Sequence, residues 1–212
     1  MRLFNARLGI HGTAGFMLFA GALIFLFGMM LAEFTYPNYN MANNFISDLG
    51  DFTHLVPALI FNTTIVIFGL SAVYAGYLLK DSLDKRLGVF LMIAGIGGAG
   101  VGIVNEGTIL LLHYFFAFTV FIVGGIAIAW SVKVLYRPPI SYIFIVLTGI
   151  VACLVTLMLI NMVFQVHLHL GIGVGGIERM VVFPTIFWVM ATGVFLFAQD
   201  QYLASSKTEK HS

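Results

Sequence analysis

The chain has 212 residues, of which 60% are hydrophobic and 9% are charged, and its mean hydropathy is +1.03. Because a soluble globular chain carries roughly 25% charged residues, this composition excludes a water-soluble fold. Ten Lys and Arg against nine Asp and Glu give a formal net charge of +1, which excludes the strongly basic surface expected of a nucleic-acid-binding protein.

Six apolar runs are long enough to cross a bilayer, whose core of about 30 Å needs about 20 helical residues. In chain order the runs are Gly9 to Phe34, Leu55 to Leu79, Leu87 to Val104, Gly107 to Val132, Ile140 to Phe164 and Met180 to Ala198. They are continuous rather than alternating, which favours helices over a β-barrel. We therefore predict an all-α polytopic membrane protein. Its six transmembrane helices form a single domain over residues 1–199, and a short polar tail follows at residues 200–212.

The basic residues divide unevenly between the two ends of the predicted helices. Arg179 falls at one end, and the other nine fall at the opposite end: Arg2, Arg7, Lys80, Lys85, Arg86, Lys133, Arg137, Lys207 and Lys210. By the positive-inside rule, both termini are expected in the cytoplasm of a cell whose membrane the chain spans. The first run is longer than the apolar part of a signal peptide, about 7 to 15 residues, so we expect it to be a retained helix.

Glycines recur at seven-residue intervals in the third run, at Gly88, Gly95 and Gly102, and the second run contains Gly69 and Gly76 at the same spacing. Small residues on one helix face let a neighbouring backbone approach closely. We therefore expect close packing along these seams.

The outer connections are longer and more polar than the inner ones, and functional sites are commonly built on such loops. In the first outer connection, Ser47 or Asp48 is expected either to cap a short turn ended by Gly50 or to take part in a site. Arg179 is the only basic residue on this side and follows Glu178. It requires an anionic partner, which is either Asp48 or the head group of a ligand.

His113 is the strongest single indication of a pocket, because ionisable groups at membrane depth usually face the bundle interior or a wet cavity. It lies seven residues after Glu106. The two share a helix face, with His113 about 10 Å deeper, if a helix begins at Glu106. The alternative is a neutral histidine hydrogen-bonded to a neighbouring helix. The candidate ligand-binding residues are Arg179, Glu178, Glu106 and Asn62.

Two kinds of chemistry are compatible with these residue types. His113, His167, His169 and Asp48 are ligand types that suit zinc, although no HExxH motif accompanies them. Ser47 is a candidate nucleophile, with His113 moving its proton and Asp48 orienting the histidine, although a GxSxG motif is missing.

The chain resembles the family known as domain of unknown function 998. The resemblance rests on Tyr36-Pro37, on Asn44 to Gly50, on Phe61-Asn62, on His113 and on Gly176 to Arg179. It implies a compact six-helix bundle in the membrane and no assigned activity. A more distant similarity is to membrane hydrolases of the alkaline ceramidase type, which hold zinc with three histidines. Those proteins have seven spans and a histidine pair four apart, whereas His167 and His169 are two apart.

From these features we expect an outward-facing polar pocket that binds or hydrolyses a membrane lipid or another small amphiphile. Two alternatives stay open. One is a carrier of small solutes or lipids, although no internal repeat is evident. The other is a structural or assembly subunit without catalytic activity, in which the glycine seams bind a partner.

Overall fold

The computed structural model describes residues 8–166 and 168–209 of the chain. Over these residues the fold is all-helical, with six long helices and one short 3-10 helix. They are α1 (Ile10–Thr35), η1 (Ser47–Gly50), α2 (Leu55–Ser82), α3 (Lys85–Ile103), α4 (Leu110–Val134), α5 (Ile140–Phe164) and α6 (Gly173–Glu209). All six long helices are long and apolar enough to cross a membrane, which confirms the predicted six-helix membrane bundle.

The helix boundaries agree with the prediction at α5 and differ most at α6. This helix begins at Gly173 instead of Met180 and continues past Ala198 to Glu209. The early start runs through Glu178 and Arg179, whose charges have partners within the protein and therefore do not end the helix. At the other end, residues 200–209 extend α6 instead of forming a separate tail. The fourth helix begins at Leu110, three residues after the predicted start.

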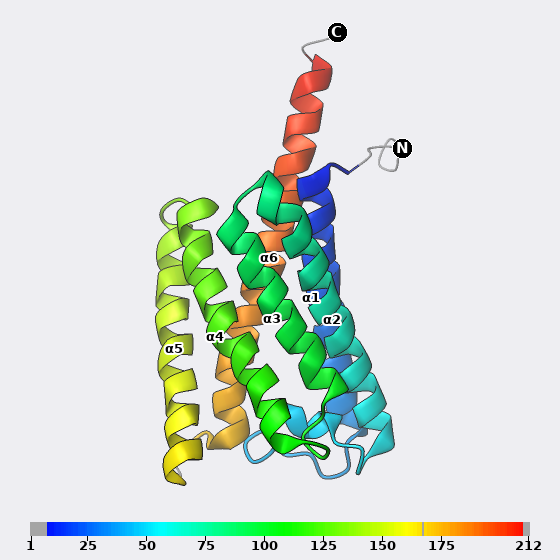
Figure 1. The fold of residues 1–212 in the computed structure, drawn as a ribbon, viewed down its shortest axis with the longest axis vertical. Helices are drawn as coiled ribbons and strands as arrows, with labels where there is room; N and C mark the ends of the chain where they lie inside the picture. The colour runs from blue at the N-terminus through cyan, green and yellow to red at the C-terminus, as the bar shows by residue number, and fades with distance from the viewer. Residues whose placement is uncertain (1–7, 167, 210–212) are drawn as a thin grey trace.

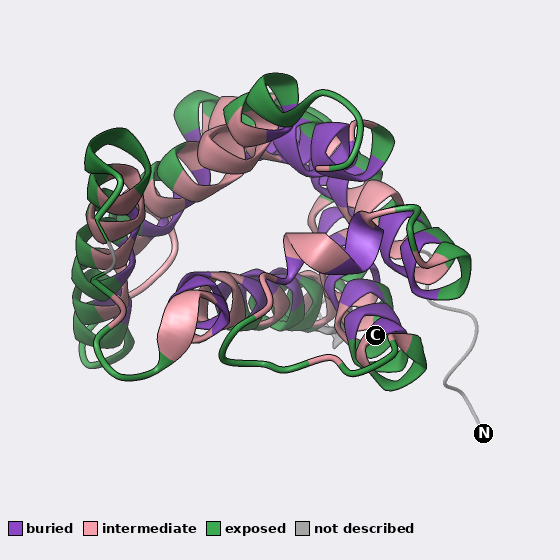
Figure 2. Ribbon diagram, turned by 90° about the horizontal axis from the view of Figure 1, so that it is seen from below, coloured by how far each residue is buried: buried purple, intermediate pink, exposed green. Residues whose placement is uncertain are grey.

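The six helices follow one another around a ring in chain order. Each packs against the next, and α6 closes the ring against α1. The closing contact includes a hydrogen bond of 2.8 Å from the backbone amide of Gly9 to the Asp200 carboxylate. The described ends of the chain lie at one end of the bundle, and η1 lies at the opposite end, inside the ring (Figures 1 and 2). Its residues Leu49 and Gly50 are buried.

The predicted glycine seam joins α2 to α3. A Cβ added to Gly69 would lie 2.5 Å from both the Gly95 carbonyl oxygen and the Ala99 amide nitrogen. Gly76 and Gly88 meet in the same way further along the two helices. Only glycine permits this backbone separation, so the seam fixes α2 against α3.

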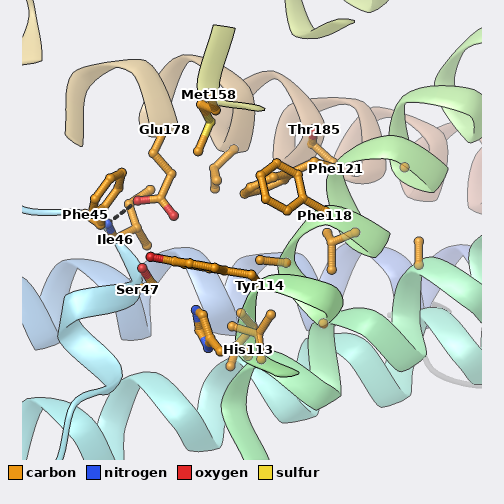
Figure 3. A pocket seen from close by; sticks show the side chains of 18 of the residues that line it. Phe45, Ile46, Ser47, His113, Tyr114, Phe118, Phe121, Met158, Glu178 and Thr185 are labelled. Carbon is orange, nitrogen blue, oxygen red and sulfur yellow. Dashed lines mark hydrogen bonds between the residues drawn. The ribbon is translucent and has the colours of Figure 1, made fainter. Parts of the chain in front are cut away.

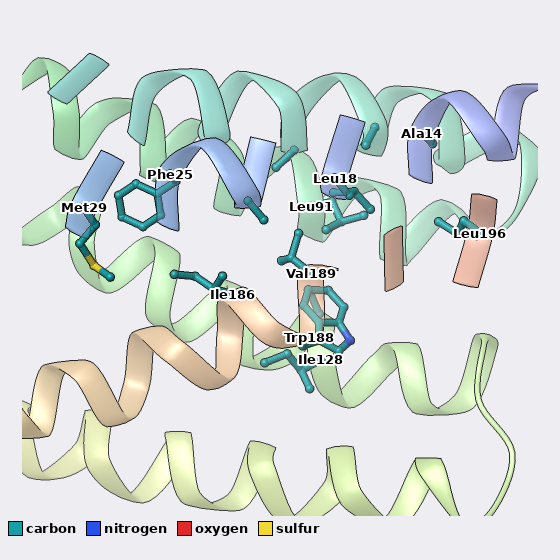
Figure 4. Close-up of a cluster of buried hydrophobic side chains, with 14 of the residues drawn as sticks. Ala14, Leu18, Phe25, Met29, Leu91, Ile128, Ile186, Trp188, Val189 and Leu196 are labelled. Carbon is teal, nitrogen blue, oxygen red and sulfur yellow. The ribbon is translucent and has the colours of Figure 1, made fainter. Parts of the chain in front are cut away.

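The buried core runs along the interior of α1 and α6 (Figure 4). Leu18, Met29 and Ile186 are among its fully buried side chains. Trp188 is also buried, and its indole nitrogen donates a 2.9 Å hydrogen bond to the Ser131 hydroxyl. Because an indole N–H at membrane depth needs an acceptor, this bond fixes the ring in the core.

Large apolar side chains face outwards on every long helix. Examples, one from each helix in chain order, are Phe27, Leu70, Ile96, Ile122, Ile143 and Phe187. A surface of this kind is stable in contact with lipid chains and is unfavourable in water. The helix least enclosed by protein is α5. Of the residues in its most apolar stretch, 17% are buried, against 56% for α3.

Candidate functional site

A cavity of about 420 Å³ lies inside the ring, and all six long helices contribute to its lining. Its volume falls within the range of about 300 to 1,000 Å³ that is typical of small-molecule sites. On α6 the lining includes Glu178 and Trp188, which are separated by about 15 Å along the helix axis at about 1.5 Å per residue. The cavity is therefore long enough to extend well into the apolar part of the bundle.

Most polar side chains of the lining belong to the end of the cavity where η1 lies, and Figure 3 shows Ser47, His113, Tyr114 and Glu178 there. The set comes from η1, the first two turns of α4, the end of α5, the start of α6 and the connections between helices: Ser47, Glu106, His113, Tyr114, Asn161, Gln165, His169 and Glu178. The remainder of the lining is almost entirely apolar, and Phe118, Phe121 and Met158 are examples. The cavity thus has one polar end and one apolar end.

Glu178 lies at the polar end and is 6% exposed. One of its carboxylate oxygens accepts a hydrogen bond from the backbone amide of Ile46 (Figure 3). This bond links the start of α6 to the residue before η1. This is the one hydrogen bond of the Glu178 side chain within the described part of the chain, and Glu178 lines the cavity. The carboxylate therefore positions the loop and presents an acceptor to the cavity.

Glu106 lies beside Ser47, whose hydroxyl donates to it over 3.1 Å. Burial, and then the charge on the nearby Asp48 carboxylate, raise the pKa of Glu106 above its usual range. Asp48 itself accepts hydrogen bonds from the Asn44 side-chain amide at 2.9 Å and from the Phe45 backbone amide at 3.0 Å. Asp48 is not among the residues that line the cavity, so its role is to hold the turn that carries Ser47.

His113 is 2% exposed and lines the cavity. Its Nδ1 is 2.8 Å from the Val104 carbonyl oxygen. A carbonyl can only accept, so Nδ1 carries the proton, and in the neutral ring Nε2 is an acceptor. The helix-face argument that paired His113 with Glu106 is wrong, because α4 begins only at Leu110. The two side chains nevertheless line the same cavity.

Arg179 is not among the lining residues, and its predicted pairing with Asp48 is wrong. It forms a salt bridge of 2.7 Å with Glu33 at the end of α1. Its terminal nitrogens donate in addition to the Tyr39 hydroxyl at 2.6 Å, and to the carbonyl oxygens of Met41, Asn44 and Gly175 at 2.9, 3.2 and 3.0 Å. With both terminal nitrogens engaged, Arg179 fastens the first outer connection to α6. Its role in holding an anionic head group stays a prediction.

Tyr39, one of the partners of Arg179, makes a further contact within the first outer connection. The Tyr39 hydroxyl also donates to the Phe45 carbonyl oxygen at 2.9 Å, and burial raises the pKa of Tyr39. Reasoning from the sequence missed Glu33 and Tyr39 as partners, and it missed Tyr114 as a lining residue. Tyr114 could have been found from the sequence, because it directly follows His113 near the start of a membrane helix.

Asn62 makes a structural contact, and its ligand-binding role stays a prediction. Its side-chain amide donates to the Gly50 carbonyl oxygen at 3.0 Å, and it is not among the lining residues. The bond fastens the end of η1 to α2. This contact accounts for a buried polar side chain in the second membrane helix.

Among the described residues, no geometry supports the predicted zinc and hydrolytic sites. Over residues 8–166 and 168–209, no three His, Cys, Asp or Glu side chains gather in a way that could hold a metal ion. His167 lies outside the described residues, and His169 lines the cavity. Ser47 donates to Glu106, and His113 bonds to Val104. No hydrogen bond joins Ser47, His113 and Asp48 into a triad in the described structure, and both chemistries stay predictions.

Comparison with known protein families identifies the family of the chain. The profile of a family described as "Protein of unknown function (DUF998)" matches residues 19–195. No curated protein and no solved structure matches the chain. The match spans the region from α1 to α6 and includes the whole polar end of the cavity. The chain therefore belongs to the DUF998 family of proteins of unknown function.

Proposed function

We propose that this protein binds a membrane amphiphile, with the apolar chain of the ligand inside the ring of helices and its head group at the polar end. The observation that carries the proposal is the division of the cavity into a polar and an apolar end. A ligand that matches both ends is amphiphilic. Because apolar burial is favourable by about 0.8 kcal/mol per CH₂ group, a single alkyl chain contributes much of the affinity.

The cavity provides its own fluorescent reporter. The chain has two tryptophans, and of these Trp188 lines the cavity. In a Trp130→Phe background, a bromine at the end of an alkyl chain in the cavity is expected to quench Trp188. The probes are ω-bromoundecylamine, ω-bromoundecanol and ω-bromoundecanoate, added to purified protein in detergent. We expect saturable quenching by at least one of them.

A pair of glycine variants separates binding in the cavity from partitioning into the detergent. Gly124 lines the cavity, and its nearest atom to an added Cβ is 3.8 Å away, so Gly124→Leu fills the cavity without a clash at the Cβ. The added side chain displaces about four carbon groups of ligand, which at about 0.8 kcal/mol each weakens binding on the order of 100-fold. Gly149 on α5 is exposed and has nothing within 4 Å of an added Cβ, so Gly149→Leu is the matched control.

The proposal fails if none of the three probes gives saturable quenching, or if Gly124→Leu and Gly149→Leu bind every probe equally well. Thermal unfolding of both variants checks that they are folded. Co-purified lipid from the wild-type protein, identified by mass spectrometry, then gives the natural ligand class.

We also propose that the chain lies in the cell membrane with both termini in the cytoplasm, so that the polar end of the cavity faces outwards. The positive-inside rule supports this orientation, because Lys80, Lys85 and Arg86 lie around the connection between α2 and α3, opposite Arg179. In a Cys153→Ser background, a membrane-impermeant thiol reagent applied to intact cells is expected to label Phe52→Cys and not Asp81→Cys. The reverse pattern contradicts the orientation.

A further inference from the structure

The polar end of the cavity carries two acidic side chains and no Lys or Arg among its described lining residues. The acidic side chains are those of Glu106 and Glu178. The nearest candidate cation, Arg179, directs its terminal nitrogens to Glu33 and to loop groups. An anionic head group would therefore meet two carboxyl groups and no basic side chain.

The same end also presents unused acceptors from two buried side chains. Glu178 is 6% exposed and His113 is 2% exposed. Each uses one atom to bond the protein backbone. Within the described part of the chain, the second carboxylate oxygen of Glu178 and the Nε2 of His113 make no further hydrogen bond, and neither atom is fully enclosed by protein. Both can therefore accept a hydrogen bond from a donor group in the cavity.

Aromatic rings complete the surroundings of these acceptors. Phe45 and Tyr114 line the same end of the cavity, on either side of Ser47 and near Glu178 (Figure 3). The faces of aromatic rings attract cations, most strongly where water is excluded. An ammonium group is a cation with up to three N–H donors, so it matches the charge, the acceptors and the rings together.

Resting on the proposed function, we infer that the ligand is a cationic amphiphile with one apolar chain and an ammonium head group, held by Glu178, Glu106 and His113. The Ser47 hydroxyl orients Glu106, and the backbone amide of Ile46 orients Glu178. This assignment reverses the expectation of an anionic head group, because that expectation depended on Arg179.

The three brominated probes test the inference, since they share one chain and differ in head group. We expect ω-bromoundecylamine to quench Trp188 at a concentration about tenfold to 100-fold lower than ω-bromoundecanol requires, because hydrogen bonds to charged groups exceed neutral ones. The carboxylate should bind more weakly than the alcohol. Equal affinity for amine and alcohol, or tighter binding of the carboxylate, overturns the inference while leaving amphiphile binding intact.

Two substitutions locate the preference at the named carboxyl groups. Glu178→Gln keeps an oxygen that can accept from Ile46, and Glu106→Gln keeps an acceptor for Ser47. Each is expected to reduce the ratio of amine to alcohol affinity severalfold with little change for the alcohol. Asp81→Asn, an exposed acidic residue at the other end of the bundle, is the control and should leave the ratio unchanged. If both glutamine variants retain the wild-type ratio, the assignment of the head-group site is wrong.

Discussion

The salt bridge between Arg179 and Glu33 predicts a large and non-additive loss of stability when one partner is removed. The two side chains are 8% and 10% exposed and 2.7 Å apart. Replacing Arg179 with Met leaves Glu33 buried without its cation, and breaking a buried pair in this way costs about 3 to 5 kcal/mol. The carbonyl oxygens of Met41 and Asn44 lose a donor in the same variant.

Glu33→Gln is expected to cost less. The glutamine oxygen still accepts from Arg179, and the guanidinium keeps its bonds to Tyr39 and to the loop carbonyls. In the double variant Arg179→Met/Glu33→Gln no buried charge is left unpaired, so it should be no less stable than Arg179→Met alone. The coupling free energy between the two positions should accordingly be at least as large as the cost of Glu33→Gln alone.

The measurement is reversible unfolding of the four proteins in mixed micelles, followed by circular dichroism, and a double-mutant cycle then gives the coupling. If the losses in the free energy of unfolding from the two single substitutions add up to that of the double variant, Arg179 and Glu33 are not coupled and the ion pair does not stabilise the fold as described. A loss below about 1 kcal/mol for Arg179→Met would show that the guanidinium is not needed to hold the loop.

Two further predictions concern pH and packing. The raised pKa of Glu106 means that the folded protein favours the protonated carboxyl, so its contribution to stability is present below the ordinary value of 4.5 and is lost as pH rises through the raised pKa. The melting temperature of Glu106→Gln should therefore exceed that of the wild type increasingly as pH rises above 4.5. Asp81→Asn should keep the wild-type pH profile. Parallel profiles for Glu106→Gln and the wild type would contradict the role of burial. For packing, Gly69→Ala places a Cβ 2.5 Å from backbone atoms of α3 and should lower the free energy of unfolding by about 1 to 3 kcal/mol. The control Gly149→Ala has nothing within 4 Å of the added Cβ and should leave the stability unchanged. Equal melting temperatures for the two variants would show that α2 and α3 can separate freely at the seam.

The spans were predictable from the sequence wherever polar residues mark the ends of an apolar run. Pro139 precedes α5 and Gln165 follows it, and both ends of α5 were predicted correctly. The start of α6 was not, because Gly173 to Arg179 combines glycines with two charges, a composition typical of a loop. That segment is helical because its two charged residues have distant partners: Glu178 bonds to Ile46, 132 positions away, and Arg179 to Glu33, 146 positions away. The local sequence does not reveal such partners.

The candidate site was predictable in part for a related reason. Placing rare polar residues at the outer ends of the spans is enough to bring Ser47, Glu106, His113 and Glu178 to one end of the bundle. Choosing the partner of Arg179 requires distances, because Glu33 and Asp48 are both acidic and both lie on the outer side. The prediction left Asp48 and a ligand head group as alternatives, and the structure places Glu33 against the guanidinium.

The polar end of the cavity combines the first outer connection with the last helix, and this has a consequence for biogenesis. A chain inserted only as far as α5 contains Glu33 without Arg179 and the Ile46 amide without Glu178. The ring is also open until α6 packs against α1. The polar end of the cavity therefore does not exist in partly synthesised chains, and it forms in the same step that closes the bundle.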